Sequence, residues 1–144
     1  MTHFGIGVST AVAAVPSTLE LAVQVDRAGL DLLTVSDHPY HADRLDAYAE
    51  IGVLLGRTER ISGLVSVTNL PTRPASMLAR TVTSLSALTG GRIVLGMGVG
   101  GLWDDIARLG FPKLTPGRAA NARRTSAVAA RWSKTSLLIS PEDT

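Results

Sequence analysis

The chain has 144 residues, of which 45% are hydrophobic and 18% charged, so it has the length and composition of one folded domain and not of a disordered chain. It contains no cysteine, which excludes disulfides, thiolate metal sites and cysteine nucleophiles and fits a cytoplasmic protein. The net charge of +2 divides into −3 over residues 1–105 and +5 over residues 106–144, where scattered arginines without a dense basic block predict a solvated tail and no nucleic-acid site.

No apolar run approaches the roughly 18–20 residues that cross a bilayer, so no membrane span is expected. The first apolar run, HFGIGVS (3–9), has no Lys or Arg before it, which favours a first strand over a signal peptide. The helix that follows is predicted to begin with a capping box, in which Ser17 caps and Glu20 reaches back, and to stop at Gly29.

Three further apolar runs are each followed by a helical pattern. The predicted strands are LDLLTVS (30–36), ISGLVSVTN (61–69) and RIVLGMG (92–98), and the helices that follow them are 46–58, 74–88 and 103–109. Strand centres near residues 6, 33, 65 and 95 give the spacing of strand-plus-crossover-helix units, whose strands are parallel. The sequence therefore predicts an α/β fold with a parallel sheet.

The pattern weakens after Gly110. A weak helix is possible from Ala119 to Trp132, and SLLIS (136–140) is the one candidate for a fifth strand. We therefore divide the chain into an α/β unit, residues 1–117, and a basic, poorly patterned tail, residues 118–144.

Functional residues of parallel α/β folds lie at the carboxyl ends of the strands, which here are the segments 8–10, 36–38, 66–69 and 96–101. Histidine is the side chain best suited to proton transfer near neutral pH, so His38 is a candidate acid or base, with Asp37 beside it on the opposite face. The alternative is that Asp37 only begins a turn with Pro39 and that His38 is incidental.

The other two polar ends are less specific. GMGVGG (96–101) fits the dinucleotide pattern G-x-G-x-x-G, but it follows the fourth strand, and no acid occurs about 20 residues later. What remains is bare backbone over residues 98–101 that a ligand could approach closely. Ser66, Thr68 and Asn69 could donate hydrogen bonds at the same edge of the sheet, or could form an ordinary strand end.

Three segments resemble the bacterial luciferase-like family of flavin- and deazaflavin-dependent oxidoreductases. They are AVQVDRAGLDLLTVSDH, RTERISGLVSVTNLPTRPASMLARTVTSLSALTGGRIVLGMGVGG and LWDDIARLGFPKLTPG, and the resemblance covers residues 3–117. It implies a TIM (β/α)8 barrel, usually a homodimer, with the cofactor ring at the carboxyl end of the strands. Since a full barrel needs about 250 residues, the chain is predicted to form an amino-terminal half-barrel of about four β/α units, truncated or altered after Gly117.

The resemblance also assigns roles to residues. His38 would be the catalytic base or polariser, and Asp37 would contact the cofactor. Many members have a non-proline cis peptide on the third strand that backs the ring, at the position of Ser66 and Val67 here. The remaining cofactor contacts implied by the resemblance are Asn69, Gly98, Val99, Gly100 and Gly101. A catalytic glutamate of one sugar-phosphate dehydrogenase subgroup corresponds to about Gly101, so that activity is not expected.

The implied chemistry is hydride transfer with the deazaflavin coenzyme F-420, favoured by Ser36-Asp37-His38, or monooxygenation with reduced FMN, on an unidentified small-molecule substrate and without a metal. Two alternatives stay open. In the first, the chain is a non-catalytic half-barrel that self-associates or pairs with another chain. In the second, it is a separate NAD(P)-binding domain built on Gly96–Gly101.

Overall fold

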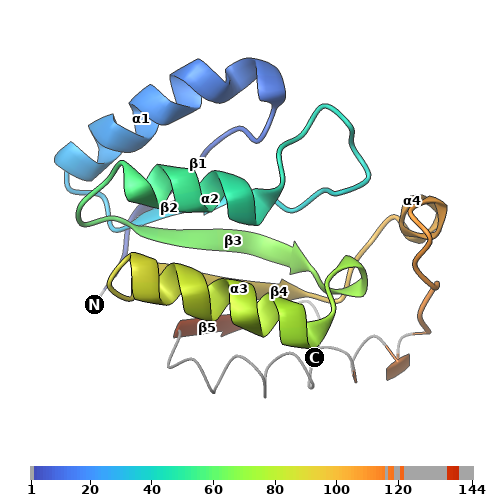
Figure 1. Cartoon of the computed structure of the whole chain (residues 1–144). Coiled ribbons are helices and arrows are strands. Elements are labelled where there is room, and N and C mark those ends of the chain that lie inside the picture. The colour runs from blue at the N-terminus through green and yellow to red at the C-terminus, as the bar shows by residue number, and fades with distance from the viewer. Residues whose placement is uncertain (1, 116, 119–120, 122–135, 140–144) are drawn as a thin grey trace.

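The structure is a computed structural model that describes residues 2–115, 117–118, 121 and 136–139 (Figure 1). The strands are β1 (Gly5–Gly7), β2 (Leu32–Val35), β3 (Ser62–Asn69), β4 (Ile93–Gly98) and β5 (Ser136–Ile139). The α-helices are α1 (Val15–Arg27), α2 (Ala47–Gly56), α3 (Ala75–Leu88) and α4 (Trp103–Arg108), and two 3-10 helices, η1 (Val12–Ala14) and η2 (Leu70–Thr72), precede α1 and α3.

The five strands form one sheet in the order β1-β2-β3-β4-β5, and every neighbouring pair is parallel. This confirms the predicted parallel α/β fold with four strand-helix units. The fifth strand, which the sequence offered only as a candidate, pairs with β4. The weak helix proposed for residues 119–132, and most of the proposed tail 118–144, lie outside the described residues.

The helices α1, α2 and α3 lie along one face of the sheet (Figure 1). The core forms between this face and the helices, and its fully buried members include Leu33, Ile51, Val65, Val82 and Leu95. Side chains on the other face of β2 and β4, such as those at positions 32, 34 and 94, are half-buried. Helices therefore cover one face of the sheet, and the other face is more open over the described residues.

The start of α1 differs from the prediction. The helix begins at Val15 with Ala14 as its N-cap, and no side chain caps it. Ser17, the predicted cap, instead donates its hydroxyl to the Ala14 carbonyl at 2.9 Å. Pro16 explains the shift, because its fixed φ suits the first turn of a helix and lets the helix start before Ser17.

Asp26, at the end of α1, fixes the loop that leads into β3. Its buried carboxylate accepts hydrogen bonds from the backbone amides of Glu59, Arg60 and Ile61 at 2.9, 3.0 and 2.7 Å. Burial alone would raise the pKa of Asp26, but these amides and the Arg60 charge outweigh it and lower the pKa. The start of β3, and through it the site at the other end of the strand, is thus anchored to α1.

Among the helices in the described part of the chain, none combines the length and the apolar character that a membrane span requires.

Candidate functional site

A cavity of about 330 Å³ opens at the carboxyl ends of β2, β3 and β4. It is lined by Asp37, His38, Tyr40, Ser66, Val67, Thr68, Asn69, Gly98, Val99, Gly100 and Gly101. Every residue that the sequence and the resemblance singled out as catalytic or cofactor-binding is in this lining. The first strand end, residues 8–10, is not in the lining, and the carbonyls of Ser9 and Thr10 there accept hydrogen bonds from Thr18 and Leu45.

The wall contributed by β3 contains a cis peptide bond between Ser66 and Val67, at the position that the resemblance indicated. The pairing of β3 with β4 shifts register between Val65 and Thr68, so the strand bulges at this bond. Ser66 and Val67 are both exposed, and Val67 keeps 39% of its surface accessible. The bulge therefore presents a small polar and a branched apolar side chain to the cavity.

Asp37 and His38 follow β2 and differ sharply in burial. Asp37 is only 5% exposed, whereas His38 is exposed at the rim of the cavity. Both carboxylate oxygens of Asp37 are bonded within the protein, to Arg73 Nε at 2.8 Å, to Arg73 Nη2 at 2.7 Å and to the Asn69 amide at 3.0 Å. This bidentate pair joins the end of β2 to the segment after β3.

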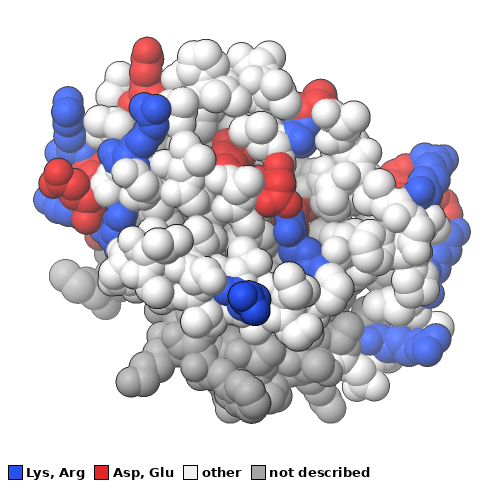
Figure 2. Space-filling view, viewed as in Figure 1, with Lys and Arg blue, Asp and Glu red and all other residues white. Residues whose placement is uncertain are grey.

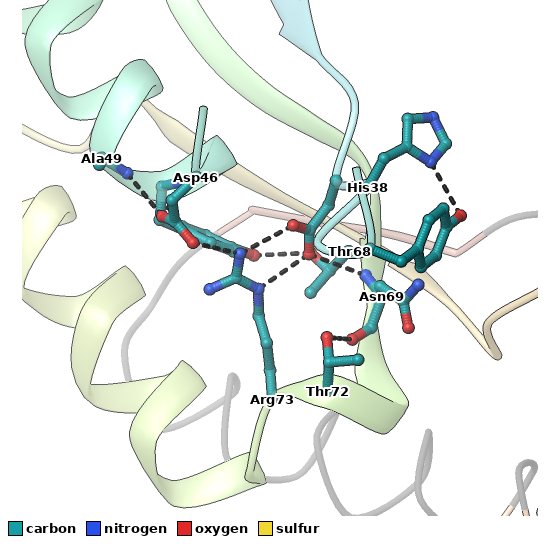
Figure 3. A network of polar contacts seen from close by, with 10 residues as sticks. His38, Asp46, Ala49, Thr68, Asn69, Thr72 and Arg73 are labelled. Atoms are coloured by element: carbon teal, nitrogen blue, oxygen red, sulfur yellow. Dashed lines mark hydrogen bonds and ion pairs between the residues drawn. The ribbon is translucent and has the colours of Figure 1, made fainter. Parts of the chain in front are cut away.

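Arg73 extends this network to α2 (Figure 3). Its Nη2 also donates to Asp46 Oδ2 at 2.7 Å, and its guanidinium lies 4.7 Å from the ring centroid of Tyr48. Tyr48 in turn shares a 2.6 Å hydrogen bond with Thr68 on β3. Burial would lower the pKa of Arg73, but the hydrogen bonds and charges of Asp37 and Asp46 outweigh it and raise the pKa. One cation thus ties three elements together behind the cavity.

Asn69 lines the cavity and has a side-chain oxygen without a hydrogen-bond partner among the described residues. The residue is 5% exposed, and this oxygen, Oδ1, is buried. Buried polar atoms are almost always hydrogen-bonded in folded proteins, so this oxygen is an exception in the wall of the cavity.

The glycines at the end of β4 and in the loop that follows it, Gly98, Gly100 and Gly101, differ in what a side chain at each position would meet. A Cβ on Gly98 would lie 2.4 Å from Val67 Cγ2, and Gly100 combines a φ of +92° with a Cβ position 2.7 Å from Pro71. Both are therefore required by packing within the protein, which the sequence interpretation of a bare ligand surface did not foresee. Gly101 has no heavy atom within 4 Å of its Cβ position, so it is the glycine that opens onto free space.

Sequence reasoning missed Arg73, Tyr48 and Tyr40. None of them stands in the last residues of a strand, the positions at which functional side chains of parallel α/β folds are expected. Tyr40 could have been found from the sequence, because it lies only two residues after His38. In the structure the two side chains are hydrogen-bonded at 3.0 Å. No cluster of three or more His, Cys, Asp or Glu side chains in the described ranges has the arrangement of a metal site.

Comparisons with known proteins identify a family and a set of solved structures that the chain matches. The family model of the luciferase-like monooxygenases matches residues 1–126. A 5,10-methylenetetrahydromethanopterin reductase of Methanolobus tindarius is 35% identical over 75 residues, which is 52% of this chain and 22% of the reductase. The chain thus spans less than a quarter of that relative.

Two solved structures share the fold. An F420-dependent secondary alcohol dehydrogenase, in complex with an F420-acetone adduct, superposes with a TM-score of 0.73 at 23% identity, over 88% of this chain and 41% of the dehydrogenase. The oxygenating constituent of 3,6-diketocamphane monooxygenase from Pseudomonas putida, in complex with FMN, gives a TM-score of 0.72 at 20% identity, over 89% and 38% of the two chains. These neighbours are TIM-barrel enzymes of which the chain matches one part.

Proposed function

Since the chain belongs to the luciferase-like monooxygenase family, we propose that it is the amino-terminal part of a luciferase-like oxidoreductase and that its cavity holds the ring of coenzyme F-420, with FMN as the alternative. The solved relatives include one F420-dependent enzyme and one FMN-dependent monooxygenase, so both cofactors occur among proteins of this fold. We place F-420 first because Ser36-Asp37-His38 resembles the deazaflavin-dependent branch. A cysteine-free chain fits the cytoplasm as its compartment.

One observation supports the proposal most strongly: His38, the bulge at Ser66–Val67 and the 98–101 loop all line the same cavity. Its volume of about 330 Å³ lies at the lower end of the range for small-molecule sites. Ser66 and Val67, both exposed at the cavity, would back the ring face. Bound F-420 supplies hydride transfer, and reduced FMN supplies oxygen activation.

His38 and Asp37 have different proposed roles in the reaction. His38, exposed at the rim, would give or take the proton that accompanies reaction of the substrate. Asp37 has no free carboxylate oxygen to offer, since Arg73 and the Asn69 amide occupy both. Its proposed contribution to cofactor binding is therefore to fix the position of Asn69 and of the loop that carries His38.

The proposal is tested by fluorescence titration of the purified chain with oxidised F-420, with FMN as competitor. The Gly101→Trp variant is expected to weaken binding at least about tenfold, because Gly101 lines the cavity, its Cβ position has no heavy atom within 4 Å, and an indole attached there would compete with the cofactor for space. Gly117→Trp is the matched control, since Gly117 is exposed, has no heavy atom within 4 Å of its Cβ position and lies outside the cavity lining, and its affinity should equal that of the parent.

Equal affinity of the parent and Gly101→Trp would place the cofactor elsewhere on the chain. A folded chain that binds neither cofactor would favour the second candidate, a non-catalytic half-barrel that self-associates. Saturable binding of NAD(P) without flavin binding would instead support the dinucleotide alternative, for which the family match gives no support.

The outward face of α2 favours self-association, and we propose a homodimer through it. Helices that are apolar all round are normally buried, and α2 has only one charged residue, Glu50, which points inward. Its exposed positions are Ala49, Val53 and Gly56, and Val53 keeps 54% of its surface accessible. In Figure 2 the surface over the middle of α2 is uncharged, and charged side chains lie towards its two ends.

The Val53→Glu variant is expected to shift the chain from dimer to monomer in sedimentation equilibrium, because a carboxylate at the centre of this face would lose its water on association. Gln24→Glu adds the same charge on the exposed face of α1 and should leave the oligomeric state unchanged. A parent chain that is monomeric at all concentrations would remove the homodimer from the proposal.

A further inference from the structure

His38 and Tyr40 form a hydrogen-bonded pair at the rim of the cavity (Figure 3). The Tyr40 hydroxyl lies 3.0 Å from His38 Nδ1, and the two ring centroids are 5.7 Å apart. Pro39 stands between them, and its ring fixes φ at the one residue that separates the pair. No other hydrogen bond to the His38 side chain occurs in the part of the chain that the structure describes, so Tyr40 alone determines which nitrogen is engaged.

Tyr40 is itself held in place. The ring of His41 packs edge-on against it, with centroids 4.9 Å apart and planes at 75°. Burial, followed by the negative charges of Asp105 and Asp37, raises the pKa of Tyr40. The phenol therefore stays protonated at neutral pH, and its hydroxyl can both donate and accept a hydrogen bond.

This amphoteric hydroxyl suits a partner that changes protonation state. A phenol is a stronger donor than acceptor, so with neutral His38 the Tyr40 O–H is expected to donate to Nδ1, and the imidazole proton then lies on Nε2. With protonated His38, the Nδ1–H donates to the Tyr40 oxygen instead. The hydrogen bond persists in both states, because the hydroxyl only reverses its direction.

We propose that Tyr40 is the positioning residue for His38, holding Nδ1 so that Nε2 is the nitrogen that exchanges a proton at the cavity. The inference rests on the function proposed for His38. A positioning residue of this kind acts without touching the cofactor, because it selects the tautomer and restricts the ring to one orientation throughout the proton-transfer cycle.

The test is the ¹⁵N spectrum of the imidazole rings in the intact chain without cofactor, compared between the parent and Tyr40→Phe. The parent should show neutral His38 almost entirely as the Nε2–H tautomer. Loss of one hydrogen bond should reduce this tautomer preference about two- to tenfold and move the Nδ1 and Nε2 resonances towards each other. Tyr40→Phe removes only an oxygen, and equal circular dichroism spectra would verify that the variant is folded.

His3→Gln is the control, since it removes an exposed imidazole outside the cavity lining and leaves the His38–Tyr40 hydrogen bond in place, and it should preserve the tautomer of His38. Identical His38 resonances in the parent and in Tyr40→Phe would overturn the inference. The proposed function is tested by a separate experiment, the F-420 titration of the parent chain. A tautomer change in a chain that binds no cofactor would therefore reject the function and leave the hydrogen-bonded pair established.

Discussion

Replacing Arg73 with methionine is expected to destabilise the fold by about 3–5 kcal/mol, the usual cost of removing one partner from a buried ion pair. The side chains of Asp37 and Arg73 are only 2% and 19% exposed. Without the guanidinium, the Asp37 carboxylate keeps only the Asn69 amide as a donor, and Tyr48 loses the cation over its ring. The free energy of unfolding in urea, measured at neutral pH, provides the comparison.

Arg80→Met is the control for this substitution, because Arg80 is an exposed arginine on α3 and its replacement should cost less than about 0.5 kcal/mol. The double variant Arg73→Met/Asp37→Asn should recover part of the lost stability, since a neutral amide is less costly to bury than an unpaired carboxylate. If Arg73→Met and Arg80→Met proved equally stable, the network behind the cavity would contribute nothing to the fold.

Replacing Glu50 with glutamine is expected to stabilise the chain at pH 8 and to have little effect at pH 4. Glu50 is 6% exposed, and neither carboxylate oxygen has a hydrogen-bond partner among the described residues. Burial raises the pKa of Glu50 to about 7 from 4.5. The folded chain therefore keeps a proton that the unfolded chain releases, so stability falls as pH rises from 4.5 and levels off above 7.

The shift corresponds to a pH-dependent penalty of at most about 3 kcal/mol, which the glutamine variant would lack. Thermal unfolding from pH 4 to pH 9 measures it, as the difference between the two stability curves. Glu59→Gln is the matched control, because Glu59 is exposed and its variant should run parallel to the parent. A Glu50→Gln curve that also ran parallel to the parent would show that the carboxylate is solvated or paired in solution.

The sequence was sufficient to locate the cavity. Apolar runs spaced by about one strand-helix unit imply parallel strands, and parallel strands bring their carboxyl ends to one edge of the sheet. Asp37, Asn69 and Gly98 therefore had to converge, and all three line the cavity. The cis bond between Ser66 and Val67 came from the family resemblance alone, because nothing in the residue types marks it.

The support behind the cavity could not be predicted from the sequence. Arg73 and Asp37 are separated by 36 positions, and no local pattern encodes which of the arginines reaches that carboxylate. The requirement for glycine at position 98 is likewise set by a side chain on the neighbouring strand, that of Val67. At Ser17 the local capping pattern was real but was overridden by Pro16, which starts the helix earlier.

Asp46 divides one carboxylate between two tasks. Oδ1 accepts the amides of Tyr48 and Ala49 at the first turn of α2, and Oδ2 accepts Arg73. Asparagine could keep the cap but would lose the charge, and glutamate would keep the charge but fit the cap poorly. In evolutionary terms we expect positions 46 and 73 to be epistatic, since a substitution at either removes a contact of the other and changes which residues are tolerated there.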